Sequence, residues 1–94
     1  MRVQLYSIFD RKARVYLAPF VSRSETDAVR QISASFRDPQ MRETPVGQHP
    51  EDFSLTRVGA FDDETGQIEA LTPPHPVCSL DELAPKAPPS TVAS

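Results

Sequence analysis

The N-terminal part of the chain contains two short segments in which apolar and polar side chains alternate. In residues 3–9 the apolar Val3, Leu5 and Phe9 share one face and Tyr6 falls on the other face, as expected for a half-buried β-strand. Residues 13–17 repeat this pattern, with Tyr16 on the polar face. Residues 10–12 would connect the two strands, and keeping both apolar sets on one face requires a connection with an odd number of residues. The positions predicted to face inward are Val3, Leu5, Phe9, Ala13, Val15 and Leu17.

A helix is predicted over residues 25–37, where apolar residues recur at spacings of three and four. Ser22 and Ser24 each provide an N-cap hydroxyl, and each is followed three residues later by an acidic side chain. Pro39 ends the helix, because the residue before a proline avoids helical backbone angles. The apolar stripe consists of Ala28, Val29, Ile32 and Phe36.

A second pair of strands is predicted after a loop at residues 40–52. Residues 53–61 form a strand pattern that places both apolar and charged residues inward unless a bulge near Gly59 shifts the alternation. An acidic turn at residues 62–66 then leads to a short strand at residues 67–71. The expected fold class is α+β, a small antiparallel sheet in ββαββ order with one helix packed on it.

The character of the chain changes at residue 72. Residues 72–94 contain six of the ten prolines, which predicts an extended, disordered or partner-bound tail. One helical turn is predicted within it at residues 79–83. The predicted organisation is therefore a domain at residues 1–71 and a mobile proline-rich tail at residues 72–94.

Charge is unevenly distributed along the 94 residues. Residues 1–42 carry eight basic and four acidic side chains, whereas residues 43–94 carry two basic and nine acidic ones. The formal net charge of −3 hides this division. Two interpretations remain open: the two halves attract each other on folding, or the basic half faces a polyanion and the acidic segment competes with it.

Several classes of protein are disfavoured. No apolar run approaches the roughly 18 residues that a membrane span needs, and no secretory signal is expected. Cys78 is the single cysteine, which excludes an internal disulfide and a cysteine zinc site and fits a reducing cytoplasm. His49 and His75 have no rigid nucleophile or metal set around them, and no glycine-rich phosphate loop is present. We expect no enzymatic activity, no cofactor and no metal.

The polar face of the predicted hairpin has the chemistry of a single-strand binder. Tyrosine rings stack on unpaired bases and arginines neutralise phosphates, although the same side chains also occur on an ordinary solvated sheet face. Three arginines spaced by seven residues follow the helix and either cover the edges of the core or track a phosphate backbone. The candidate nucleic-acid-binding residues are Arg2, Tyr6, Arg11, Lys12, Arg14, Tyr16, Arg23, Arg30 and Arg37.

Five segments together resemble a known family. They are LYSIFD at residues 5–10, YLAPF at 16–20, SRSE at 22–25, HPEDFSL at 49–55 and VGAFDDETG at 58–66. In this order they resemble the small non-structural proteins of gokushovirus-type microviruses, which are bacteriophages with single-stranded DNA genomes. The resemblance covers roughly residues 1–71. It implies an accessory role in the host cytoplasm, in DNA binding linked to single-stranded genome synthesis and packaging.

The function expected from these observations is that of a non-enzymatic phage accessory protein that binds single-stranded DNA. The alternative is a protein-interaction module that uses a sheet edge or the acidic turn at residues 62–64. Its partner would be a second copy, in a homodimer, or a phage or host replication or packaging protein. No membrane partner is expected.

Overall fold

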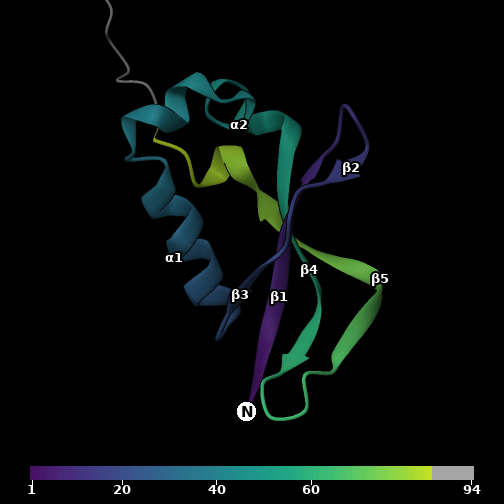
Figure 1. Ribbon diagram of the computed structural model, residues 1–94. Helices are drawn as coiled ribbons and strands as arrows, with labels where there is room; N and C mark the ends of the chain where they lie inside the picture. The colour runs from purple at the N-terminus through teal and green to yellow at the C-terminus, as the bar shows by residue number, and fades with distance from the viewer. Residues whose placement is uncertain (86–94) are drawn as a thin grey trace, which may run out of the picture.

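Five strands form one antiparallel sheet in the computed structural model, which describes residues 1–85 (Figure 1). The order of strands is β2-β1-β4-β5, and β3 pairs with the first half of β1 while β2 pairs with its end. Three strands thus precede the main helix, so the predicted ββαββ order lacked β3, although the mixed α and β composition is confirmed. The strands are β1 (Arg2–Asp10), β2 (Val15–Tyr16), β3 (Phe20–Ser22), β4 (Phe53–Asp62) and β5 (Ile68–Ser79).

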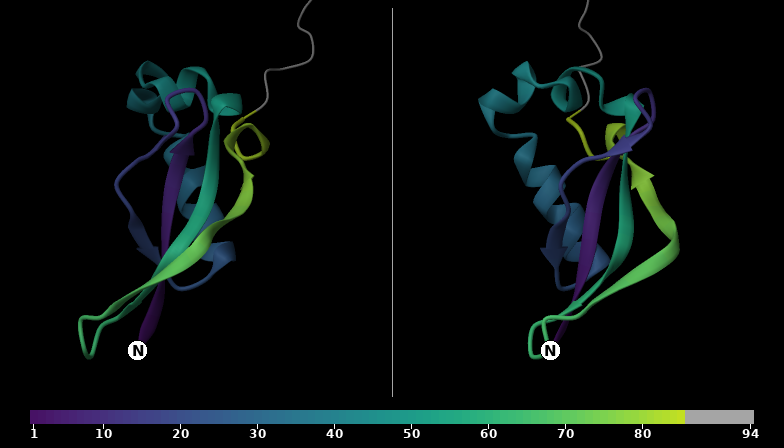
Figure 2. Two further views of the ribbon diagram at one scale, coloured as in Figure 1. Left: turned by 90° about the vertical axis from the view of Figure 1, so that its right-hand side faces the viewer. Right: turned by 45° about the vertical axis from the view of Figure 1, so that its right-hand side comes forward.

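Helix α1 (Glu25–Ser35) covers one face of the sheet (Figure 2). The left view of Figure 2 looks at the other face of the sheet, with α1 behind it. Of the two predicted N-caps, Ser24 is the one used: its hydroxyl accepts the Asp27 N–H at 3.1 Å. The Ser22 hydroxyl instead donates to the Asp27 carboxylate at 2.8 Å. The helix is therefore fixed at its first turn to the end of β3.

The segment predicted as a loop at residues 40–52 contains three short helical turns. They are η1 (Pro39–Glu43), α2 (Pro45–Gln48) and η2 (Pro50–Asp52). Each begins with a proline. Proline has no backbone N–H, but at the first position of a helix an N–H would have no acceptor within the helix, so no hydrogen bond is lost. Val46 of α2 is buried against the core, so this segment closes one end of the sheet.

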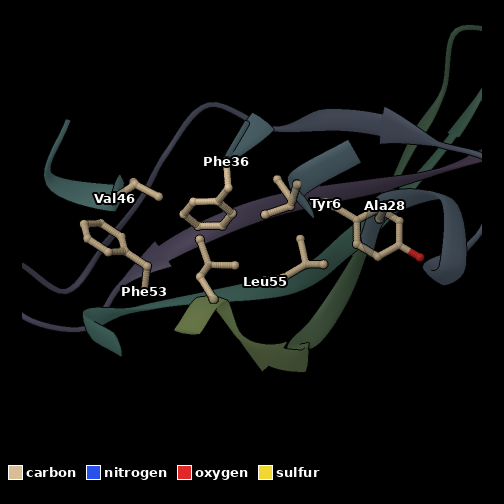
Figure 3. Close-up of a cluster of buried hydrophobic side chains, with 8 residues drawn as sticks. Tyr6, Ala28, Phe36, Val46, Phe53 and Leu55 are labelled. Carbon is tan, nitrogen blue, oxygen red and sulfur yellow. The ribbon is translucent and has the colours of Figure 1, made fainter. Parts of the chain in front are cut away.

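The core lies between the sheet and these helices, and Figure 3 shows its side chains. Tyr6 is 1% exposed and faces α1, and its ring centroid lies 6.1 Å from that of Phe20. The sequence pattern placed Tyr6 outward, and this prediction is wrong, because the even positions of β1 face the helix. The tyrosine ring has a large apolar surface to bury, which outweighs its polar hydroxyl. The buried apolar residues are Tyr6, Ala28, Ile32, Phe36, Val46, Phe53, Leu55 and Leu80.

The connection between β1 and β2 also differs from the prediction. Asp10 pairs with Val15, which leaves four residues between them instead of an odd number. The Asp10 carboxylate accepts the N–H groups of Lys12 and Ala13, both at 3.0 Å, and so holds the turn. Arg14 adopts a φ of +60°, in the left-handed region. The register brings Tyr16 opposite Phe9, on the sheet face that α1 leaves uncovered.

The predicted bulge near Gly59 is confirmed. Leu5 pairs with Gly59 and Tyr6 pairs with Arg57, so Val58 is the extra residue in β4. A side chain at Gly59 would not fit, because its Cβ would lie 2.2 Å from the Glu69 carbonyl oxygen on β5. Arg57 precedes the bulge and lies on the helix side of the sheet with Leu55, and the bulge then brings Ala60 to that side in place of Gly59.

Residues beyond 71 are part of the folded domain, which corrects the predicted boundary. β5 continues to Ser79, and Leu80 of η3 (Leu80–Glu82) is 0% exposed within the core. Prolines are tolerated in β5 because it is an edge strand of the sheet. The remainder of the predicted tail, residues 86–94, lies outside the described residues.

Candidate nucleic-acid interface

The two tyrosines proposed as a joint stacking platform point to opposite faces of the sheet. Tyr6 lies under α1, where burial raises the pKa of its hydroxyl. Tyr16 is 47% exposed and lies opposite Phe9, on the other face. A platform formed by both phenol rings is therefore wrong, since α1 covers one of them.

Tyr16 nevertheless belongs to a group of residues in the β1–β2 hairpin that we call the hairpin site, defined by Phe9, Lys12, Arg14 and Tyr16. The Tyr16 ring packs on Phe9 with centroids 4.6 Å apart and planes inclined by 41°, which fixes the orientation of its exposed part. Lys12 and Arg14 are exposed in the adjoining turn, and within residues 1–85 neither side-chain cation has a carboxylate oxygen within 4.0 Å. The hairpin site thus combines an oriented aromatic ring with two cations that no ion pair neutralises.

The other basic residues of β1 and its turn are engaged elsewhere. Arg2 forms an ion pair with Glu69. Arg11 donates to the Glu51 carbonyl and to the Ser79 hydroxyl, so it ties the end of β1 to the start of β4 and the end of β5. Arg2 and Arg11 lie at opposite ends of β1 and contribute to different surfaces. The structure does not bring them together with Lys12 and Arg14 as one row.

The three arginines spaced by seven residues do not all lie on the helix. Arg30 is within α1, Arg23 precedes the N-cap and Arg37 follows the C-cap residue. All three are exposed, and none has an ion pair in the part of the chain that the structure describes. Arg30 is therefore carried by α1 itself, and Arg23 and Arg37 lie at its two ends.

Among residues 1–85, the ion pairs between the basic and acidic halves lie at one end of the sheet. The N-terminal ammonium lies 2.7 Å from the Asp63 carboxylate and 2.8 Å from the Glu64 carboxylate, and these contacts raise its pKa. With the Arg2–Glu69 pair, this joins the start of β1 to the β4–β5 turn. The exposed basic residues without an ion pair among residues 1–85 are Arg11, Lys12, Arg14, Arg23, Arg30, Arg37 and Arg42.

Sequence reasoning missed Arg57, which is half-buried on the helix side and donates to the Gln4 amide oxygen at 3.1 Å. The sequence contained a signal for this position, because strict alternation along the predicted strand at residues 53–61 places Arg57 on the inward face. Sequence reasoning also missed the apolar character of the uncovered sheet face. That face presents Val21 and Ile68, which are 52% and 67% exposed.

The groups considered for catalysis or metal binding are placed as follows. The ligand atoms of His49, Glu51 and Asp52 lie within 4.8 Å of one another at the surface, beside η2. Cys78 is half-buried in β5, where burial raises its thiol pKa, so the unreactive protonated form is favoured. His75, on the same strand, is exposed and pairs across the sheet with Arg57. Cys78 and His75 thus lie on a paired strand and not in a loose tail.

Comparison with known proteins identifies the family. Within residues 1–85, no helix is long and apolar enough to cross a membrane. No curated protein and no solved structure matches the chain. A family model described as Phage ORF5 protein matches residues 3–83, from the first strand to the segment that carries Leu80. The chain therefore belongs to the Phage ORF5 protein family.

Proposed function

We propose that this chain is a non-enzymatic accessory protein of a gokushovirus-type microvirus that binds single-stranded DNA in the host cytoplasm. Its role would lie in the synthesis or packaging of the single-stranded viral genome. Membership in a phage protein family supports the setting, and the resemblance of residues 1–71 supports the type of phage. The observation that carries the proposal is the hairpin site, where an exposed Tyr16 ring closely follows in the chain two cations that have no ion-pair partners among residues 1–85.

Each residue of the hairpin site has a specific part in this proposal. An unpaired base stacks on the exposed portion of the Tyr16 ring, which Phe9 supports from beneath. Lys12 and Arg14 contact the flanking phosphates. Both belong to the turn that the Asp10 carboxylate holds, and this turn directly precedes the strand that carries Tyr16. The exposed arginines along α1 add a weaker, sequence-independent attraction for further phosphates.

The proposal is tested by fluorescence anisotropy of a labelled oligothymidine with the full chain at several salt concentrations. Tyr16→Ala is expected to weaken binding by about 5- to 150-fold, the effect of losing one base-stacking contact. Tyr16→Phe keeps the ring and serves as the matched control, with binding close to that of the unmodified chain. Lys12→Gln with Arg14→Gln should reduce the log–log salt slope by about 1.4, which corresponds to two phosphates. Absence of binding at low salt would refute the proposal.

Self-association through the uncovered sheet face is a second candidate function. Apolar side chains gather there at the β1 start, and nothing among residues 1–85 covers the most exposed of them. Cross-strand pairing places five of these residues on the same face. They are Val3, Leu5, Val21, Phe61 and Ile68.

A second copy of the chain is the occupant that the charges favour. The acidic turn at residues 62–64 lies at one end of the β1–β4 pair, and the basic turn at residues 11–14 lies at the other end. Two copies packed face to face in opposite directions would bring each acidic turn near the partner's basic turn. Association by edge pairing is disfavoured on β5, because Pro73, Pro74 and Pro76 lack the N–H groups that a new strand would need.

Light scattering over a range of protein concentrations tests this second function. Dimers are expected, and Ile68→Asp should convert them to monomers because it places a charge in the apolar contact. Glu64→Lys should weaken the dimer, and adding Lys12→Glu should restore it by reversing both charges. A monomer at all concentrations would eliminate this candidate and leave DNA binding unaffected.

A further inference from the structure

The helix side of the sheet has a cleft of about 270 Å³ near the start of β1. The cleft opens where β5 separates from β4. Ala70 pairs with Gly59 and His75 pairs with Arg57, so the four β5 residues between these two pairs have only Val58 opposite them on β4. Figure 1 shows β5 bending away from β4 at this point. The cleft is close to the lower end of the size range of small-molecule sites, about 300 Å³. It is lined by Arg2, Gln4, Arg57, Gly59, Ala60, Glu69, Ala70 and Leu71.

Arg57 is the residue in this cleft that lacks a counter-charge. It is half-buried, and its one side-chain hydrogen bond among residues 1–85 goes to the neutral amide oxygen of Gln4, at 3.1 Å. No carboxylate in this part of the chain lies within 4.0 Å of it. A guanidinium has five N–H donors, and removing it partly from water without an anion is unfavourable. An anion in the cleft would satisfy these donors.

The other polar groups of the cleft agree with this charge requirement. Arg2 adds a second guanidinium, which is held by Glu69, so the cleft has two cations for one carboxylate. The Gln4 amide nitrogen provides a neutral donor once its oxygen has accepted from Arg57. Ala60 and Leu71 provide an apolar wall beside these donors.

We propose that this cleft binds a phosphate group, with the Arg57 guanidinium as its principal ligand and the Gln4 amide and Arg2 as additional donors. Planar guanidinium groups match phosphate oxygens in paired hydrogen bonds, which a lone ammonium cannot do. The phosphate belongs either to a free mononucleotide, whose sugar would lie on the apolar wall, or to a single-stranded nucleic acid. The cleft and the Tyr16 ring are on opposite faces of the sheet, so this site does not depend on the hairpin site.

NMR titration of the full chain tests the proposal, with observation of arginine Nε–Hε and glutamine side-chain signals. The probes are inorganic phosphate, thymidine monophosphate, and thymidine as the control without phosphate. The Arg57 and Gln4 signals are expected to shift to saturation with both phosphate probes and not with thymidine. Arg57→Gln should weaken binding about 10- to 150-fold, the effect of losing hydrogen bonds between charged groups. Arg42→Gln removes an exposed arginine of equal charge that has no part in either proposed site, and it should leave binding unchanged.

The outcomes separate this site from the hairpin site and separate the two phosphate sources. Tyr16→Ala should leave the phosphate titration unchanged even if it abolishes DNA binding. Tighter binding of thymidine monophosphate than of inorganic phosphate supports a free nucleotide, whereas competition by an oligonucleotide alone supports a nucleic-acid backbone. Equal affinity in Arg57→Gln, with Arg57→Lys as a second folded variant, would overturn the proposal. Equal shifts of Arg57 and Arg42 would also overturn it, because they show nonspecific ion binding.

Discussion

Tyr6 and Phe20 lie opposite each other on β1 and β3, with ring centroids 6.1 Å apart, and both rings are on the side of the sheet that α1 covers. This pair connects the short edge strand β3 to the core, because Tyr6 is buried and the partly buried Phe20 packs against the core cluster. The contact explains why Tyr6 contributes to folding and is not available to a ligand.

The two tyrosines should therefore respond differently to truncation. Tyr6→Ala is expected to lower the free energy of unfolding by about 3–5 kcal/mol, as for other large aromatic residues in a core. Tyr16→Ala removes a half-exposed ring from a two-residue strand and should cost less than about 1.5 kcal/mol, the added value of an aromatic pair. Urea unfolding followed by circular dichroism measures both. Equal losses would contradict the assignment of Tyr6 to the core.

Leu80 tests whether the chain beyond residue 71 belongs to the domain. Its side chain is fully buried, so Leu80→Ala should lower the free energy of unfolding by about 2–5 kcal/mol. Ile68, which is 67% exposed on β5, provides the control, and Ile68→Ala should change stability by no more than about 0.5 kcal/mol. The same urea experiment applies. A Leu80→Ala effect as small as that of the control would show that residues after 71 only rest on the surface.

The parts of the fold that followed local rules were predictable. The α1 start depends on Ser24 and an acidic first turn, and the β4–β5 turn depends on Gly66 at a φ of +76°, so both are readable from a few neighbouring residues. The face of β1 that points into the core was not predictable from the sequence. It depends on which face of the sheet α1 covers, and both faces of the strand carry apolar or aromatic residues. The start of β5 was predicted, but its continuation beyond residue 71 was missed because its prolines disfavour a strand in isolation, whereas at a sheet edge they lose no inter-strand hydrogen bond.

The candidate site was predictable to a similar degree. The basic turn with Tyr16 came directly from the sequence, since its residues are neighbours in the chain. Arg57 and Gln4 are 53 residues apart, and only the β1–β4 register brings them together. The β4 bulge and the departure of β5 then open the cleft beside them, and neither feature has a local signal strong enough to place it exactly.

Gly59 should tolerate no side chain. An added Cβ would lie 2.2 Å from the Glu69 carbonyl oxygen, so β4 and β5 must separate to accommodate it. Gly59→Ala is expected to lower the free energy of unfolding by about 1–3 kcal/mol, the usual effect of overpacking. Hydrogen exchange should show faster exchange of β5 amides that pair with β4. Slower or unchanged exchange of these amides would contradict the close approach of the two strands.

The stability of the β3–α1 junction should depend on the ionisation of Asp27. The Ser22 hydroxyl is the main cause that lowers the pKa of this carboxyl, and the Gln31 amide and the Arg23 backbone N–H act in the same direction. Because the pKa is lower in the folded state, the charged carboxylate stabilises the fold above its ordinary pKa of about 4 and this contribution is lost as the pH falls through the folded value. Ser22→Ala should raise the pKa of Asp27 toward its ordinary value, measured by carboxyl ¹³C NMR titration. Asp27→Asn should flatten the acid limb of the curve of unfolding free energy against pH. An unchanged Asp27 titration in Ser22→Ala would show that the hydroxyl contact does not control this junction.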